Sequence, residues 1–174
     1  MPDFPPFRSG HRVVSIATVL DAGVTPTLTF IARIDIEVAA PIDLGVGDGP
    51  HRRIVPILGG TVRGPELNGI VLPGGADFQV LRTDTRTELE ARYAIETDDG
   101  ERVYIENFGI RSGSAEDIGR ITRGEPVDPS RIYFRSSPRM SAVGERWSWL
   151  TSRIMVARGE RQPDSVRLEV FVVD

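Results

Sequence analysis

The chain has 174 residues, of which 40% are hydrophobic and 26% charged, a composition typical of one soluble globular domain. It contains no cysteine, which excludes disulfide bonds and thiolate metal sites. Its 21 basic residues are all arginines scattered among 25 acidic residues, so lysine Schiff-base catalysis is excluded and nucleic-acid binding is not expected.

The N-terminal segment, residues 1–26, is predicted to be a partly flexible arm, because three of its first six residues are proline. An additional strand is predicted at residues 12–20. Ser15 and Thr18 interrupt its apolar run, so it resembles neither a signal peptide nor a membrane span. We therefore expect a cytoplasmic protein with no membrane partner, in which residues 27–174 form a single domain.

Strands are predicted along most of this domain. Residues 28–38 alternate between apolar and polar side chains, as a half-buried strand requires, and residues 88–97 repeat the pattern. The turn at residues 98–100 ends in Asp-Gly and predicts a hairpin with a strand at residues 102–111. In the strand predicted at residues 28–38, one face carries Leu28, Phe30, Ala32, Ile34, Ile36 and Val38. Further strands are predicted at residues 53–63, 67–72, 77–82, 131–136, 147–157 and 166–173.

Helical signal is confined to residues 115–122, where Ser114 can act as an N-cap and Asp117 follows three residues later. Residues 41–50 are predicted to form a mobile loop, and a second long loop is expected at residues 112–129. Many short strands punctuated by glycine and proline indicate a sandwich or a barrel. The 18 glycines favour a barrel, because tightly curved sheets need glycine kinks.

Several spaced blocks carry a family resemblance. They lie at residues 53–61, 64–65, 72–79, 91–93, 98–100, 107–111, 124–129, 133–135 and 149–150. In this order they resemble the DUF3237 family, also called UPF0311, over about residues 28–173. The resemblance implies a barrel similar to the allene oxide cyclase and dirigent barrels and, by analogy, a homo-oligomer. With the glycines, it predicts an all-β, closed antiparallel up-and-down β-barrel of about eight to ten strands with little helix.

Familiar catalytic motifs are absent from the sequence. There is no nucleophile elbow, and the glycines of residues 45–49 are not followed by a helix, as a phosphate-binding loop requires. The histidines are His11 and His51, too few for a histidine-rich metal centre or a Ser-His-Asp triad. We therefore expect neither a cofactor nor a metal.

Asp77 is the carboxylate that we single out as a catalytic candidate. It follows the glycine pair at residues 74–75 and precedes Phe78, so it is expected to stand against apolar surface. Desolvation there would raise its pKa and suit it to proton transfer near neutral pH. The alternative is a buried Asp77 that is held by an arginine and backbone amides and serves only the fold.

Further polar and aromatic residues complete the candidate site. Tyr133 and Tyr104 are proposed as catalytic hydrogen-bond donors to an oxygen that gains charge in the transition state. Arginine can bind a substrate carboxylate bidentately, and a tryptophan can line an aromatic pocket. The alternatives are solvated strand faces for the arginines and core packing for the tryptophan. The candidate substrate-binding residues are Arg135, Asn107, Arg111, Arg53 and Trp149.

Two functions of different classes follow from these observations. The first is a cofactor-independent enzyme that acts on a small hydrophobic metabolite in the barrel cavity, as a cyclase, isomerase or hydro-lyase using general acid–base catalysis. The alternative is a non-catalytic small-molecule binding or carrier barrel. A third hypothesis is a structural subunit whose barrel is filled with side chains. For the enzyme and for the carrier barrel, the expected partner is a small organic molecule.

Overall fold

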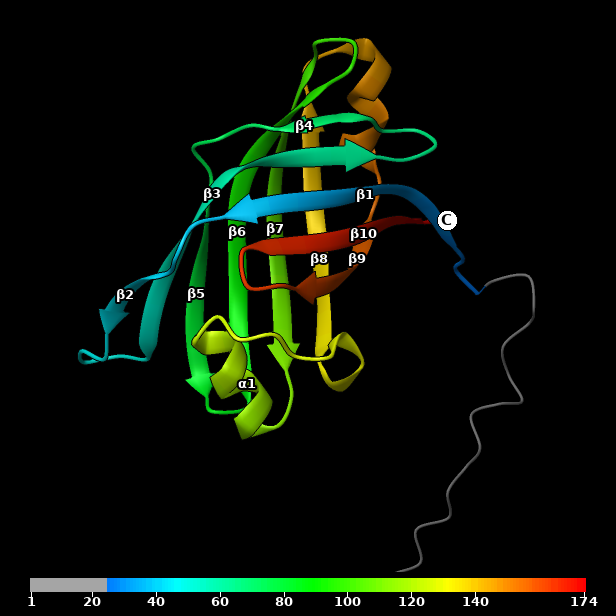
Figure 1. Ribbon diagram of the computed structural model, residues 1–174. Helices are drawn as coiled ribbons and strands as arrows, with labels where there is room; N and C mark the ends of the chain where they lie inside the picture. The colour runs from blue at the N-terminus through cyan, green and yellow to red at the C-terminus, as the bar shows by residue number, and fades with distance from the viewer. Residues whose placement is uncertain (1–24) are drawn as a thin grey trace, which may run out of the picture.

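Ten strands form one antiparallel sheet that closes on itself as a barrel (Figure 1). The computed structural model describes residues 25–174, so the strand predicted at residues 12–20 lies outside the described residues. The strands are β1 (Leu28–Val38), β2 (Ile42–Gly45), β3 (His51–Arg63), β4 (Gly69–Val71), β5 (Ala76–Thr83), β6 (Arg86–Thr97), β7 (Arg102–Ser112), β8 (Tyr133–Ala142), β9 (Met155–Arg161) and β10 (Ser165–Val173).

Closure of the barrel depends on β1, which pairs with β10 on one side and with β3 on the other. From β5 to β10 each strand pairs antiparallel with the next, as in an up-and-down meander. β5 also pairs with β3, while the short strands β2 and β4 extend the sheet alongside β3. The predicted all-β, closed antiparallel barrel with little helix is confirmed.

Three short helices accompany the strands: α1 (Ala115–Thr122), η2 (Pro129–Arg131) and η3 (Glu145–Ser152). The α1 prediction is confirmed to the residue, and the Ser114 side chain accepts a hydrogen bond from the Asp117 amide at 3.1 Å. α1 lies at one end of the barrel, near the ends of β5 and β7 (Figure 1). Within the described residues, no helix is both long enough and apolar enough to cross a membrane.

The strand prediction is wrong at residues 147–152, which form most of η3. Trp147 and Leu150 are the buried side chains of this helix, and their spacing of three is the period of a 3₁₀-helix rather than of a strand. The predicted loop at residues 41–50 is also partly wrong, because it contains β2.

The predicted alternation along β1 holds only after its first residues. The register shifts between Phe30 and Ala32, so Ile31 and Ala32 are both buried although they are neighbours in the chain. Leu28 and Phe30 are consequently exposed, against the prediction that they share a face with Ile36. The bulge therefore separates an outward-facing start of β1 from the part that lines the barrel.

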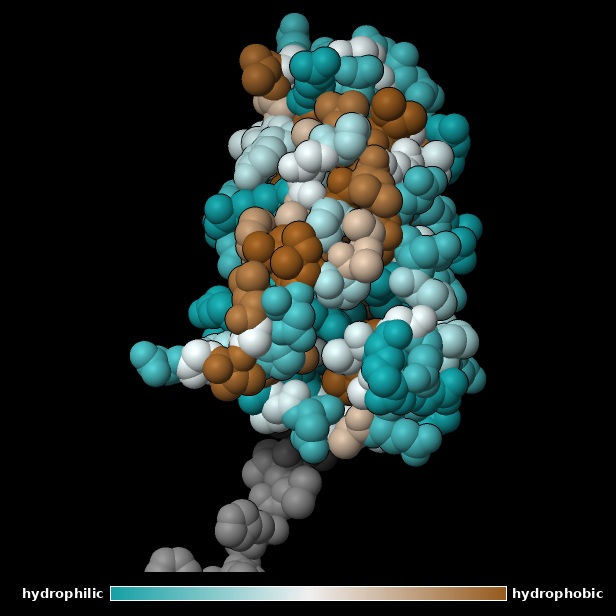
Figure 2. Space-filling model, turned by 60° about the vertical axis from the view of Figure 1, so that its left-hand side comes forward, coloured by the Kyte–Doolittle hydropathy of each residue, from teal (hydrophilic) through white to brown (hydrophobic). Residues whose placement is uncertain are grey.

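Apolar side chains also occur on the outer surface of the barrel. Figure 2 shows them among hydrophilic residues on the face where β2, β3 and β5 come forward. The exposed apolar residues on β2 to β5 are Ile42, Leu44, Leu58, Ile70 and Phe78.

Gly60 occupies the tightest part of the closure between β1 and β3. It pairs with Ile36 and has a φ of 143°, which side-chain-bearing residues rarely adopt. A Cβ atom built at Gly60 would lie 2.0 Å from the carbonyl oxygen of Asp35, whose backbone belongs to β1. The two strands can therefore approach one another only because residue 60 has no side chain.

We expect Gly60→Ala to lower the free energy of unfolding by about 2–3 kcal/mol, because the methyl group adds a clash to backbone strain. Urea unfolding followed by circular dichroism measures the change. Gly47→Ala is the matched control, since a Cβ there meets nothing within 4 Å, and it should change stability by less than about 0.5 kcal/mol. Equal effects of the two substitutions would contradict the role assigned to Gly60.

Candidate functional site

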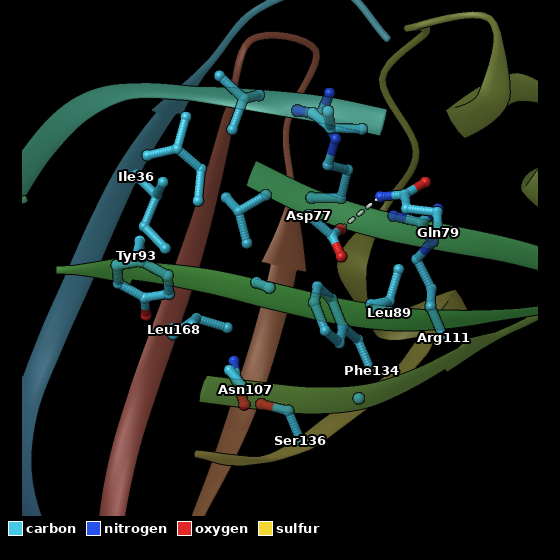
Figure 3. A pocket seen from close by; sticks show the side chains of 17 residues that line it. Ile36, Asp77, Gln79, Leu89, Tyr93, Asn107, Arg111, Phe134, Ser136 and Leu168 are labelled. Carbon is cyan, nitrogen blue, oxygen red and sulfur yellow. Dashed lines mark hydrogen bonds between the residues drawn. The ribbon is translucent and has the colours of Figure 1, made fainter. Parts of the chain in front are cut away.

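A cavity lies inside the barrel, and its walls are mostly aliphatic with a smaller set of inward-facing polar side chains (Figure 3). The cavity has a water-accessible volume of about 40 Å³. The lining residues are Ile36, Val38, Val55, Ile57, Asp77, Gln79, Leu89, Ala91, Tyr93, Asn107, Gly109, Arg111, Phe134, Ser136, Arg161, Val166 and Leu168.

Asp77 is the one acidic side chain among the described residues that line this cavity. It lies on β5 two positions before Gln79, so both side chains point inward. Its Oδ2 accepts a hydrogen bond from Gln79 Nε2 at 2.6 Å, whereas Oδ1 is buried without a partner although the residue as a whole keeps some exposure. Burial raises the pKa of Asp77. The opposing effects of the Gln79 hydrogen bond, the Arg111 charge, the Glu90 backbone amide and the Arg53 charge do not cancel it.

Three arginines bring positive charge close to Asp77. Arg111 of β7 and Arg161 of β9 line the cavity directly. Arg53 of β3 lies behind Gln79, donates from Nε to Gln79 Oε1 at 2.7 Å and is 5% exposed. Burial, reinforced by repulsion from Arg53, lowers the pKa of Arg111 to about 10, so its guanidinium is still charged at neutral pH.

The opposite part of the cavity carries uncharged polar groups. Tyr93 Oη, Asn107 Oδ1 and Ser136 Oγ are buried and have no hydrogen-bond partner among the described residues. Asn107 and Ser136 approach one another from β7 and β8, and Tyr93 lies on the other side of Asp77 from Gln79 (Figure 3). Burial, and then the charge of Asp77, raises the pKa of Tyr93, so its hydroxyl stays protonated and can donate a hydrogen bond.

The structure brings together about half of the candidate residues chosen from the sequence. Asp77, Asn107 and Arg111 line the cavity, and Arg53 contacts it through Gln79. Trp149 does not reach the cavity, because η3 holds it partly buried against the core at a separate surface groove. Its alternative assignment, packing, is the one that the structure supports.

The predicted place of Tyr104, Tyr133 and Arg135 in the barrel interior is wrong. Tyr104 and Tyr133 are 45% and 54% exposed, because alternation along β7 and β8 turns them outward. Arg135 is also exposed, donates to the Phe134 carbonyl at 2.9 Å and stacks 5.3 Å from the Tyr133 ring centroid. Asn107 is three residues from Tyr104 on the same strand, so the two side chains cannot both face inward.

Four polar residues of the cavity are not among the candidates predicted from the sequence. Alternation could have identified Gln79 and Ser136. Gln79 shares a face of β5 with Asp77, and Ser136 shares a face of β8 with the apolar Phe134. Tyr93 stands in the apolar series of β6 and therefore resembles a core residue. Arg161 ends a charged stretch of β9 and carries no local signal for burial.

Metal-binding side chains are not clustered in the part of the chain that the structure describes. No three His, Cys, Asp or Glu residues there lie close enough together to hold a metal ion. The polar groups that line the cavity are instead one carboxylate, two guanidinium groups, two amides and two hydroxyls, which suit hydrogen bonding and proton transfer to an organic molecule.

The fold and the cavity together define a closed antiparallel barrel with charged and polar groups in an apolar interior. The sequence matches the family model described as "Protein of unknown function (DUF3237)" over residues 26–173. The chain belongs to this family, and the predicted family membership is confirmed. The UPF0311 protein RPA1785 of Rhodopseudomonas palustris is 47% identical over 156 residues, which cover 86% of this chain and 99% of that protein.

Solved structures share the barrel. The crystal structure of RPA1785 has a TM-score of 0.81, with 42% identity over 86% of this chain and 99% of that one. A β-barrel-like protein from Acinetobacter baumannii has a TM-score of 0.75 and 32% identity, over 86% of this chain and 97% of that one. An enzyme from Penicillium herquei has a TM-score of 0.64 and 16% identity, over 86% and 95% of the two chains, and therefore shares the fold.

We expect Asp77→Asn to stabilise the folded protein more at about pH 8 than at about pH 4. Because folding raises the pKa of Asp77, the wild type loses stability as the pH rises from the unfolded-state pKa of about 3.9 through the higher folded-state value. Asparagine has no such proton. Urea unfolding of both proteins across this range gives the difference in unfolding free energy. A difference that stays constant, or shrinks with rising pH, would show that the arginines fully compensate the carboxylate.

Proposed function

We propose that this protein is a cofactor-independent enzyme that converts a small, largely hydrophobic metabolite inside the barrel by general acid–base catalysis. The observation that carries the proposal is the Asp77 carboxylate, which is directed into an apolar cavity with one oxygen buried and unpartnered. A carboxyl whose pKa is raised by burial can both accept and return a proton, which is what cyclisation, isomerisation and dehydration have in common.

The proton balance of such a reaction needs no external reagent. Asp77 takes a proton from one atom of the substrate and returns it to another, so isomerisation or cyclisation leaves the composition of the substrate unchanged. In a dehydration the returned proton would go to a departing hydroxyl group, which leaves as water. Asp77 regains its starting state in either case.

Tyr93 is the group best suited to stabilise the oxygen that gains charge. Its hydroxyl is buried and protonated, and no described residue occupies its donor. Asn107 and Ser136 provide further polar contacts that could orient the substrate across the cavity from Asp77. The enzyme from Penicillium herquei adds an analogy at the level of the fold, since a barrel of this shape houses an enzyme there.

Asp77→Asn should lower turnover by at least about 100-fold, because asparagine cannot take up a proton at neutral pH. The substrate is sought by incubating wild type and variant with a Rhodopseudomonas palustris metabolite extract in D₂O. Mass spectrometry then identifies compounds that are consumed or gain deuterium with wild type. Circular dichroism serves as the folding control, since the asparagine carbonyl can still accept the Gln79 hydrogen bond.

The carrier function is the alternative outcome of the same experiment. The mostly aliphatic walls of the cavity suit a barrel that binds an apolar molecule without converting it. Folded wild type and Asp77→Asn proteins that retain the same metabolites, with no compound consumed or deuterated by either, would replace the proposed enzyme with a carrier.

We expect Tyr93→Phe to reduce turnover by about 10-fold or more while leaving the fold at least as stable as wild type. The substitution removes a buried hydroxyl that lacks a partner, so no internal hydrogen bond is lost. Thermal unfolding and turnover of the metabolite found above provide the two measurements. A fall in melting temperature with unchanged turnover would make Tyr93 a packing residue instead.

A further inference from the structure

The charged groups of the cavity indicate the chemical class of the molecule that enters it, an inference that rests on the proposed function. We propose that this molecule is a small organic acid whose carboxylate binds Arg111, with Arg53 and Arg161 adding positive charge and an apolar body filling the remaining space. The sections of wall around Asp77 then contact the part of the molecule that reacts.

The balance of charges in the cavity is the first argument. Arg111 and Arg161 line the cavity and Arg53 lies behind Gln79, whereas Asp77 is the one acidic residue among the described residues that line it. Asp43 attracts Arg53 and Asp164 attracts Arg161, but neither carboxylate lines the cavity. Arg53 interacts repulsively with both Arg111 and Arg161. A buried excess of like charge is costly unless an opposite charge joins it, so an anion would relieve the repulsion.

Arg111 supplies the second argument, because its free donors have the right geometry. The residue is 1% exposed, and both Nε and Nη2 are buried without a hydrogen-bond partner among the described residues. These two nitrogens lie side by side along one edge of the planar guanidinium. That edge matches the two oxygens of a carboxylate and can donate two parallel hydrogen bonds.

Arginines on the outside of the barrel behave differently. Arg92, Arg158 and Arg167 each lie within 3.0 Å of a glutamate or aspartate oxygen. The exposed arginines thus have a carboxylate partner, although solvent already screens their charge. The guanidinium of Arg111 is desolvated, yet no carboxylate oxygen accepts a hydrogen bond from its Nε or Nη2. An arginine that served only the fold would be expected to have its buried donors satisfied.

The aliphatic part of the cavity determines the rest of the ligand. Ile36, Val55, Leu89 and Leu168 also line the cavity and offer no hydrogen-bonding side chain. A molecule that binds Arg111 at one end therefore presents an apolar or aromatic body here. This requirement separates an organic acid from a free inorganic anion, which would contact only the arginines.

The test compares matched acids and amides of the same shape on the wild-type protein. Benzoate, phenylacetate and hexanoate are titrated against benzamide, phenylacetamide and hexanamide by calorimetry at neutral pH, with inorganic phosphate as a further probe. We expect at least one acid to bind tenfold or more tightly than its amide, and also more tightly than phosphate. The inference is overturned if no acid is preferred over its amide, or if phosphate binds as tightly as the acids.

Variants then locate the preference. Arg111→Met should abolish it without lowering the melting temperature, because the substitution removes a desolvated guanidinium with two unpartnered donors and keeps much of the volume. Arg102→Gln is the control with the same change of charge on the same strand, since that side chain is 73% exposed, and it should bind acids as the wild type does. Should Arg111→Met fail to fold, Arg161→Gln takes its place and should weaken acid binding severalfold. An acid preference that survives in the folded variant would contradict the proposal.

Asp77→Asn distinguishes this inference from the proposed function. Removing the carboxylate should tighten acid binding or leave it unchanged, since a negative charge beside the ligand disappears, while turnover is lost. Acid preference together with unimpaired turnover in Asp77→Asn would refute the proposed catalysis and keep the inference. Turnover that is lost in Asp77→Asn without any acid preference in the wild type would refute the inference and keep the catalysis.

Discussion

The pairing of β1 with both β10 and β3 is the constraint on which the rest of the structure depends. A sheet that closes has an inside, so alternate residues along most of its strands are directed into a narrow interior. Side chains from strands far apart in the sequence then meet there, among them Asp77 of β5, Arg111 of β7 and Leu168 of β10. Gly60 permits this closure because its missing side chain lets β1 and β3 approach closely. The backbone at Gly60 thus supports the site without contacting it.

The interior combines two regions with opposite physical character. Ile34, Ile95, Ile105 and Val170 are essentially inaccessible to solvent and belong to a continuous apolar core that stabilises the barrel. The cavity next to this core contains buried donors and acceptors without partners, which reduce stability. Such groups persist where the surrounding core is large enough to offset their cost, and they are commonly found at functional sites. The polar groups of the cavity therefore do not contribute to the stability of the fold, in contrast to the apolar core beside them.

Local patterns in the sequence were sufficient for most of the secondary structure and for part of the site. The bounds of β1 and α1 followed from alternation and from the Ser114 cap, and Asp77 was selected for its apolar setting. The same reasoning failed for η3, because Trp147 and Trp149 alternate like strand residues although the buried pair is Trp147 and Leu150. The register shift in β1 likewise cannot be predicted from the sequence. Residues 30–32 are all apolar, so the pattern does not show which of them are buried.

By itself, the sequence determined the all-β class, the approximate extent of most strands and, away from the bulge in β1, which residues of a strand share a face. Only the tertiary structure decided which face is the interior, and it turned Asn107 inward and Tyr104 outward. It also decided that Arg53, Arg111 and Arg161, from three different strands, come close enough to interact with the Asp77 carboxylate. The physical reason is that alternation separates the two faces of a strand but does not show which face is buried. Burial and the clustering of charges depend on contacts between residues that lie far apart in the chain.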